Sequence, residues 1–278
     1  MIRIRILGSA AGGGLPQWNC ACANCLAARA GKIARQTQSS VAFSDDDERW
    51  FLINASPDLA GQIERAPALW PRPDSPRNTP IAGIFLTNAD LDHGLGLLLL
   101  RQQETPLVVY ATGETRAALD WIDRALKAFC GVEWRPVSRD FTSLSKGVAF
   151  RAISLPKSIA LQFRDQSINM SVLIAPAVGD LSDELHDSIK TSDVVLFDGT
   201  FWRDDELLAV RPGARTAREM NHLPIDSSLE FLRQSQARRK LYTHINNTNP
   251  ILMPGSRERA QVERAGIEIA CDGLEIVL

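Results

Sequence analysis

Short apolar runs along this chain alternate with amphipathic stretches, a rhythm typical of strands separated by helices. The apolar runs predict strands at 2–7, 39–44, 50–54, 81–86, 107–111, 148–153, 158–163, 170–175, 194–198, 240–244, 267–270 and 275–278. Stretches with helical spacing of apolar positions predict helices at 26–32, 58–64, 95–103, 114–129, 181–190, 225–234 and 256–265. Five prolines between 67 and 80 predict an irregular surface loop.

The predicted elements follow a similar order in the two halves of the chain, where meandering strands lead into strands with helices between them. This order predicts mixed sheets covered by helices. No stretch has the composition of a linker between domains. The simplest interpretation is one α/β domain over residues 1–278, an αββα sandwich whose two mixed sheets are flanked by helices.

Composition and charge narrow the class of protein. With 45% hydrophobic and 23% charged residues, the chain has the composition of an ordinary globular protein. A net charge of -2 argues against nucleic acid or an anionic membrane as the main partner, and no apolar run is long enough to span a bilayer. The first seven residues alternate like a strand, unlike a signal peptide. The oligomeric state stays open, with a homodimer among the alternatives.

Three of the five cysteines, Cys20, Cys22 and Cys25, lie within six residues of one another. This spacing is unlike an extracellular disulfide framework, so the cytoplasm is the expected compartment. A redox pair needs only two cysteines, whereas three thiolates in one tight loop suit a structural, tetrahedral zinc ion. Free thiols are the alternative. The fourth zinc ligand is open, with His222, a water or another residue as alternatives.

The strand predicted at 81–86 ends in a polar turn that carries Asn88, Asp90, Asp92 and His93. The chain has only four histidines, and one of them stands here beside two carboxylates. Ligands on a short turn after a buried strand can converge on one ion without rearrangement. The turn therefore predicts a metal site. The alternative is a solvated loop in which His93 helps to cap a helix.

Two later strands also end in residues that bind metals. The strand predicted at 194–198 ends in Asp198, and the one at 240–244 ends in His244. Neighbouring strand ends share one edge of a sheet, so these side chains can meet Asp92 and His93 over one spot. The alternative is that Asp198 caps a turn and His244 is an ordinary buried histidine. Their recurrence at strand ends favours a shared site.

Several unusual stretches place the chain near a known family. They are Gly-Ser-Ala-Ala-Gly-Gly-Gly at 8–14, the cysteine loop at 17–25, Asn-Ala-Ser-Pro-Asp-Leu at 54–59, Thr-Asn-Ala-Asp-Leu-Asp-His at 87–93, Asp-Gly-Thr-Phe-Trp at 198–202 and His-Ile-Asn-Asn-Thr-Asn-Pro-Ile-Leu at 244–252. Together they resemble the metallo-β-lactamase superfamily and, within it, the branch that works in pyrroloquinoline quinone (PQQ) biosynthesis. The resemblance implies the αββα fold.

The departures from the superfamily's dinuclear hydrolases concern one of their two metal sites. Those hydrolases carry His-x-His-x-Asp-His after the buried strand, but the first two histidines are here Asn88 and Asp90. A third histidine should fall near Pro156, where this chain has none. The residues that match the other site are intact, namely Asp92, His93, Asp198 and His244. The resemblance therefore implies one catalytic metal, with Asp90 as a further carboxylate ligand.

Ligand chemistry then narrows the reaction. Two histidines with carboxylate and open positions suit Fe(II), which can take dioxygen and substrate. A single ion lacks the two-metal clamp used in hydrolytic displacement. The resemblance implies iron-dependent hydroxylation, with dioxygen, of the tyrosine ring in a Glu-Tyr-derived PQQ precursor. The alternatives are a transport or carrier protein for PQQ or its precursor, and a metallo-hydrolase of the β-lactamase type.

Four further residues take roles from this resemblance or from their charge. Related members place a histidine at the position of His222, at the rim of the active site, as a proton donor or substrate contact; a solvent-exposed helix cap is its alternative. Related phosphodiesterases have a histidine zinc ligand where this chain has Asn247, which adds Asn247 to the candidates for the fourth ligand. Arg101 and Lys157 are candidate anchors for substrate carboxylates, against the ordinary role of solvated surface charges.

Overall fold

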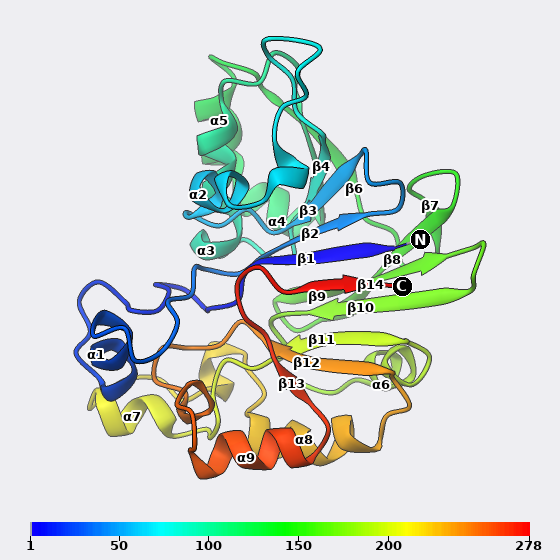
Figure 1. Cartoon of the computed structure of the whole chain (residues 1–278). Helices are drawn as coiled ribbons and strands as arrows, with labels where there is room; N and C mark the ends of the chain where they lie inside the picture. The colour runs from blue at the N-terminus through cyan, green and yellow to red at the C-terminus, as the bar shows by residue number, and fades with distance from the viewer. Residues whose placement is uncertain (1) are drawn as a thin grey trace.

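In the computed structural model, which describes residues 2–278, two mixed sheets pack face to face (Figure 1). The first sheet contains, in spatial order, β14 (Glu275–Val277), β1 (Arg3–Gly8), β2 (Ser40–Ser44), β3 (Trp50–Ile53), β4 (Ile81–Phe85), β5 (Leu107–Ala111) and β6 (Val132–Pro136). The second contains β13 (Glu268–Ile269), β12 (Arg239–Thr243), β11 (Val194–Asp198), β10 (Met170–Ala175), β9 (Ser158–Asp165), β8 (Val148–Leu155) and β7 (Thr142–Ser143).

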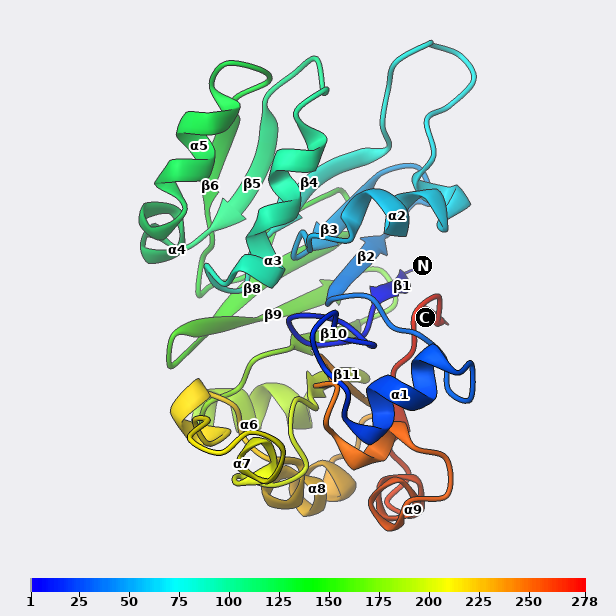
Figure 2. The ribbon, with the colours of Figure 1, turned by 90° about the vertical axis from the view of Figure 1, so that its left-hand side faces the viewer.

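Helices cover the outer face of each sheet (Figures 1 and 2). Those on the first sheet are α2 (Leu59–Glu64), α3 (Leu91–Gly94), α4 (Gly113–Ala118) and α5 (Asp120–Leu126). Those on the second are α1 (Ala23–Arg29), α6 (Asp183–Lys190), α7 (Glu206–Val210), α8 (Ile225–Gln234) and α9 (Arg257–Arg264). This arrangement confirms the predicted sandwich of two mixed sheets flanked by helices. None of the helices within residues 2–278 has the length and apolar character needed to cross a bilayer.

Three apolar clusters hold the layers together. The middle one fills the space between the sheets, where the rings of Phe43 and Phe163 stack with their centroids 4.6 Å apart and Phe85 packs edge-on against Phe163. The two outer clusters bury one face of each helical layer against its sheet. Burial of aromatic and branched side chains on both faces explains why the central strands are continuous apolar runs.

Several predicted elements differ from the structure. The helix expected at 95–103 is α3 followed by a 3-10 helix over Leu95–Leu100. A Cβ on Gly96 would lie 2.2 Å from the carbonyl oxygen of Ser56. The two backbone segments therefore pack so closely that only glycine fits at position 96. The helix expected at 114–129 is broken at Leu119 into α4 and α5. β6, β7 and α7 were not predicted, because edge strands and very short elements carry little apolar pattern.

The parallel strands of each sheet bring their carboxyl ends to one edge. β11 and β12 are neighbours in parallel register, so that Asp198 pairs with Thr243, the residue before His244. β4 lies among the parallel strands of the first sheet and leads into the turn that precedes α3. The residues that follow β4, β11 and β12 therefore meet between the two sheets.

Candidate metal centre

The strand ends deliver two overlapping groups of possible metal ligands. One group is Asp92, His93 and His244, and the other is Asp198, His222 and His244; within each, the ligand atoms lie within 4.8 Å of one another. We call the first group the catalytic cluster. Five of the predicted site residues thus come together around His244. The sixth, Asp90, belongs to neither group.

His93 is fully buried and held so that one ring nitrogen remains free. Its Nδ1 lies 2.6 Å from Oδ1 of Asn88 and 3.2 Å from Oγ1 of Thr87. Two neighbouring oxygens keep the ring proton on Nδ1 and leave the lone pair on Nε2. Nε2 is buried without a hydrogen-bond partner within residues 2–278, and Oδ2 of Asp92 is 3.8 Å away. A cation between these atoms would satisfy the orphaned nitrogen.

His244 and Asp92 complete the catalytic cluster. Nδ1 of His244 lies 2.8 Å from Oγ1 of Thr200, and its Nε2 lies 3.2 Å from Oδ2 of Asp92. The backbone of His244 has a φ of 57°, in the left-handed region that non-glycine residues seldom adopt outside constrained sites. Two imidazole nitrogens and one carboxylate oxygen form a donor set that suits Fe(II) with open positions.

The protonation states in the catalytic cluster also suit a cation. Burial, only partly offset by Asp92, lowers the pKa of His93 to about 4, so the ring is neutral at neutral pH. Burial works against ionisation of Asp92, but His93 and His244 beside it hold the pKa of that carboxyl well below its usual value. A neutral imidazole and an ionised carboxylate are the forms that bind metals.

Asp198 is fully buried and makes four hydrogen bonds. Its Oδ1 accepts from the backbone N–H and from Oγ1 of Thr200, at 2.9 and 2.6 Å. Its Oδ2 accepts from the N–H of Val178 and from Nδ1 of His222, both at 2.8 Å. Asp198 therefore joins a metal only by giving up one of these bonds, and the bond to His222 is the one that faces the cluster.

His222 and Asp198 shift one another's protonation. Burial opposes the charge on His222, but the carboxylate of Asp198 outweighs it and raises the pKa of the ring. Burial likewise opposes the charge on Asp198, but His222 holds the pKa of the carboxyl below its usual value. The pair thus favours an imidazolium, which can donate a proton.

Asn88 and Asp90 bind each other. Nδ2 of Asn88 donates to Oδ2 of Asp90 at 2.7 Å, and the N–H of Asp90 donates to Oδ1 of Asn88 at 3.1 Å. The same Oδ1 receives Nδ1 of His93. The expected role of Asp90 as a ligand therefore has no geometric support, because its carboxylate is engaged by Asn88. Together these two residues orient His93.

A cavity of about 510 Å³ opens beside the catalytic cluster and His222. Asp92, His222 and His244 line it, and so do the cationic side chains of Lys157 and Arg215. Arg101, the other predicted anchor, is exposed and does not line this cavity. The cavity can therefore admit a small molecule to the catalytic cluster, beside two cations in its wall.

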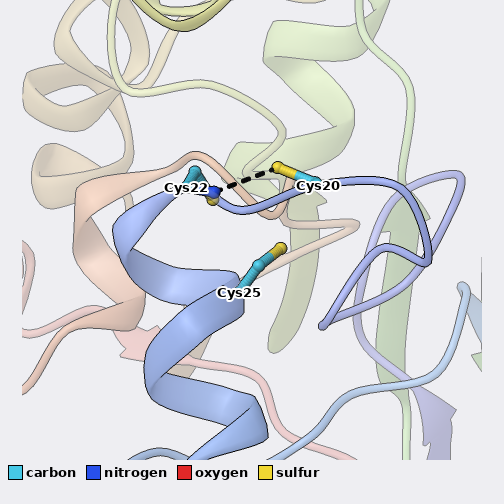
Figure 3. A group of neighbouring side chains, drawn as sticks. All are labelled: Cys20, Cys22 and Cys25. Carbon is cyan, nitrogen blue, oxygen red and sulfur yellow. Dashed lines mark hydrogen bonds between the residues drawn. The ribbon is translucent and has the colours of Figure 1, made fainter.

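The three cysteines form a second group, with sulfur atoms within 4.8 Å of one another (Figure 3). Cys25 lies in α1, and Cys20 and Cys22 come from the loop before it. We call this group the cysteine cluster. Burial raises the pKa of the Cys25 thiol to about 11, so a cation is required to hold all three sulfurs as thiolates.

The side chain of Asn247 caps the cysteine cluster. Its amide Nδ2 lies 3.2, 3.5 and 3.3 Å from the sulfurs of Cys20, Cys22 and Cys25. Ligand atoms in a tetrahedral zinc site of sulfur and oxygen donors stand roughly 3.5 Å apart. Rotation of the amide by half a turn would place its oxygen at the fourth position. His222, another candidate for that position, is paired with Asp198 instead.

The segment 244–249 connects the two clusters. It begins with His244 and includes Asn247. Nδ2 of Asn24, in α1, donates to the carbonyl oxygens of Asn247 and Asn249 at 2.9 and 2.8 Å. Nδ2 of Asn249 donates to the carbonyl oxygen of Gly199 at 2.9 Å. The cysteine loop is therefore tied to the ends of both β11 and β12.

Sequence reasoning missed several residues that shape the site. Thr200 links Asp198 and His244, and its place two residues after the end of an apolar strand was an available signal. Glu206 is buried, which raises its pKa to about 7, and it accepts hydrogen bonds from Thr248 Oγ1 and the N–H of Trp202. No pattern pointed to Glu206, because its side-chain partner Thr248 lies 42 residues away in the sequence.

Comparison with known proteins agrees with this geometry. The profile of the "Beta-lactamase superfamily domain" matches residues 49–245. Coenzyme PQQ synthesis protein B of Cupriavidus necator is 40% identical, and that of Pseudomonas paraeruginosa is 41% identical; in both cases the alignment covers all of this chain and all of the relative.

Solved structures show the same relationship. A crystal structure of Zn(2+)-bound PqqB from Methylobacterium extorquens has a TM-score of 0.90 and 36% identity, and covers 99% of this chain and 100% of its own. A diphosphatase of the PhnP family shares the fold, with a TM-score of 0.76 at 21% identity and coverage of 100% and 98%. The chain thus belongs to the beta-lactamase superfamily and, within it, to the family of coenzyme PQQ synthesis protein B.

Proposed function

We propose that this chain works in PQQ biosynthesis as an oxidoreductase that uses Fe(II) and dioxygen to hydroxylate the tyrosine ring of a Glu-Tyr-derived precursor. Full-length similarity to proteins named for PQQ synthesis supports the pathway. The free thiols and the absence of a membrane-crossing helix within residues 2–278 are compatible with a cytoplasmic location.

One observation carries the choice of reaction. The buried Nε2 of His93 has no hydrogen-bond partner among residues 2–278 and faces Asp92 and His244. Asn88 and Asp90, where the hydrolases have metal ligands, bind each other instead. The donor atoms thus suit a single ion with two nitrogens and one carboxylate oxygen. Hydrolysis with two metals would need a second set of donors, which Asn88 and Asp90 do not supply.

The side chains divide the work. His93, His244 and Asp92 would hold the metal, and Asp198 would join them when His222 releases its Oδ2. When bound there, Fe(II) supplies open positions and the one-electron chemistry that dioxygen requires. Thr200 and Asn88 fix the two imidazole rings through their Nδ1 atoms. These contacts orient the lone pairs of both Nε2 atoms toward one point.

His222 has the properties of a proton donor. It lines the cavity, and Asp198 favours its protonated form. A proton from His222 can neutralise negative charge that develops on oxygen during the reaction. When that proton leaves, the hold of His222 on Asp198 weakens, so the two residues change state together.

The test is oxygen consumption by the chain loaded with Fe(II) under anaerobic conditions and then mixed with precursor, a reductant and labelled dioxygen. We expect substrate-dependent uptake and a product that carries one labelled oxygen atom. The same chain loaded with zinc in both clusters is the control and should consume no oxygen. Cleavage of an ester or phosphodiester would instead identify a metallo-hydrolase, and tight binding of precursor or PQQ without turnover would identify a carrier.

A further inference from the structure

We propose that Lys157 and Arg215 form a two-point binding site for substrate carboxylates in the wall of the cavity. We call this pair the carboxylate clamp. The inference names two substrate-binding residues of the site described above and so rests on the proposed function. It depends on three observations: the backbone of Lys157, the contacts that hold it, and the charges in the cavity wall.

Lys157 stands at the tip of the hairpin between β8 and β9, where Leu155 pairs with Ser158 across a two-residue turn. Its φ is 58°, in the left-handed region. Glycine and asparagine are favoured at such a position, because the Cβ of other residues lies too close to the following carbonyl oxygen, at a cost of about 1 kcal/mol. Neither takes the position, so the turn keeps a lysine against its backbone preference. Strain of this kind is concentrated at functional sites.

The segment that carries Arg215 also holds this turn. Asn221, with a φ of 66°, donates from Nδ2 to the carbonyl oxygen of Pro156 at 2.6 Å. A Cβ on Gly179 would lie 2.2 Å from Oδ1 of Asn221, so a glycine is needed to make room for that side chain. The backbone beside Lys157 is therefore fixed relative to the segment 215–222. This contact joins the hairpin that carries Lys157 to the loop that carries Arg215, and both side chains line the same cavity.

The acidic side chains that line the cavity of about 510 Å³ have hydrogen-bond partners in the protein, whereas the lysine and the arginine have none among the described residues. Oδ2 of Asp90 accepts from Asn88, and Oε2 of Glu219 accepts from the N–H of Thr216. The side chains of Lys157 and Arg215 have no hydrogen bond or ion pair with any residue in 2–278. The third acid in the wall, Asp92, has its Oδ2 3.2 Å from Nε2 of His244. Each acid thus has a partner within residues 2–278, whereas the two cations are free to bind a ligand. Lysine and arginine in a cavity bind carboxylates through charge-assisted hydrogen bonds.

Lys157 also lines a second cavity of about 690 Å³, on the side of α4. The lining of this cavity includes Thr112, Thr115 and Ser158, with Glu114 as its only acid within the described chain. Among the described residues Lys157 alone lines both cavities, so it stands at their junction. A carboxylate on Lys157 would place the rest of the molecule within reach of both the catalytic cluster and the hydroxyl groups of the second cavity.

The test is calorimetric binding of PQQ, itself a tricarboxylate, to the zinc-loaded chain. Lys157→Asn removes the charge and suits the left-handed turn, and Arg215→Gln removes the other charge. We expect each to raise the Kd about tenfold, the loss of one charge-assisted hydrogen bond. Lys157→Arg and Arg215→Lys keep the charge and should bind more tightly than the neutral variants. Arg101→Gln, an exposed site outside both cavities, is the matched control and should bind like the unchanged chain.

Thermal unfolding separates this role from a structural one. Lys157→Asn should unfold at the same temperature as the unchanged chain or a higher one, because asparagine tolerates the backbone better. Weaker binding without loss of stability supports the clamp. Unchanged Kd in both neutral variants, an equal loss in Arg101→Gln, or no binding of PQQ by the unchanged chain would overturn it.

The two proposals fail in different ways. If PQQ binding depends on both cations but precursor produces no oxygen uptake, the clamp stands and the hydroxylase does not. If oxygen uptake occurs while Lys157→Asn and Arg215→Gln leave both KM and Kd unchanged, the hydroxylase stands and the clamp does not.

Discussion

The cysteine cluster and the catalytic cluster hold their ligand atoms in opposite ways. The cysteine cluster comes from one loop of six residues and is capped by Asn247 from a distant strand end. The catalytic cluster gathers Asp92 and His93 with His244, about 150 positions later in the chain, from the ends of β4 and β12 in the two different sheets. The proposed zinc would hold the cysteine loop in place, whereas the donors of the catalytic cluster are positioned by the fold beside a cavity.

The difference follows from the surroundings of the donor atoms. Burial raises the pKa of the Cys25 thiol and the neighbouring thiols raise it further, so the three sulfurs ionise together only beside a positive charge. The imidazoles of the catalytic cluster each have one nitrogen hydrogen-bonded and the other directed at Asp92. The segment 244–249 belongs to both, so a change in the cysteine cluster reaches His244 through the backbone.

The largest effect is expected from His244→Ala, which removes a ligand shared by both groups of donors. Loss of a residue that only orients a ligand costs ten- to a hundredfold in metal affinity, so loss of a ligand should cost more than about a hundredfold and abolish activity. Zinc in the cysteine cluster should remain. His244→Asn, in which the new residue tolerates the left-handed backbone, should lose metal and activity in the same way. His186→Ala, at a partly buried histidine that stacks on Phe231 outside both clusters, is the control. Elemental analysis that finds the cysteine-cluster zinc lost would contradict the comparison.

The next effect is expected from Cys22→Ser, which removes one sulfur from the cysteine cluster. The loop should lose its zinc, and the melting temperature should fall by about 10 °C, because a structural zinc contributes directly to folding. Cys271→Ser, at an exposed and isolated thiol, is the matched control and should melt normally. The affinity of the folded variant for Fe(II) in the catalytic cluster should stay close to that of the unchanged chain, since Cys22 is not one of its ligands. Normal melting of the zinc-free variant would show that the cluster is not structural.

A smaller effect is expected from pH in the metal-free chain. His93 stays neutral in the folded state down to about pH 4, whereas an unfolded imidazole takes up a proton near pH 6.5. Between these values the unfolded state binds more protons, so stability should fall as pH drops, by up to roughly 3 kcal/mol. The pKa of His222 is raised in the folded state, so at higher pH, above the pKa of an unfolded imidazole, its effect on stability is the opposite: stability falls as pH rises. In the His93→Gln variant, the melting temperature should depend less on pH between 4 and 6.5 than in the unchanged chain. The same dependence in both would refute the argument from burial.

The smallest effect is expected from Asn88→Ala, which removes the acceptor 2.6 Å from Nδ1 of His93. Thr87 remains as a second acceptor, so iron affinity should fall only about tenfold. Asn88→Asp keeps an oxygen in place and should retain more affinity than the alanine variant. Titration with Fe(II) under anaerobic conditions measures both. If Asn88→Ala binds Fe(II) as tightly as the unchanged chain, Asn88 does not orient the His93 ring.

Much of the fold could be read from the sequence, because strands that are buried on both faces are continuous apolar runs. The strands β4 and β11, which position Asp92 and Asp198, are such apolar runs, whereas β12 before His244 begins with two charged residues and is buried only from Leu241 onward. The broken helix at Leu119 and the edge strand β6 were missed, because packing and exposure decide them rather than local pattern. A helix as short as α7, with five residues, is too short to show a helical period.

The site divides in the same way. Residues at strand ends were found, since they stand where an apolar run stops. The partners that complete them were not, because Asn88 and Thr200 act through hydrogen bonds that only tertiary structure forms. Arg215 is exposed and lies in a loop, so nothing in its sequence surroundings pointed to the cavity.

The most direct test of a single metal ion in the catalytic cluster is anomalous X-ray scattering from crystals of the Fe(II)-loaded chain, recorded at the iron and zinc absorption edges. The account predicts one iron peak between His93, His244 and Asp92 and one zinc peak at the cysteine cluster. A second metal peak beside Asn88 and Asp90 would contradict it.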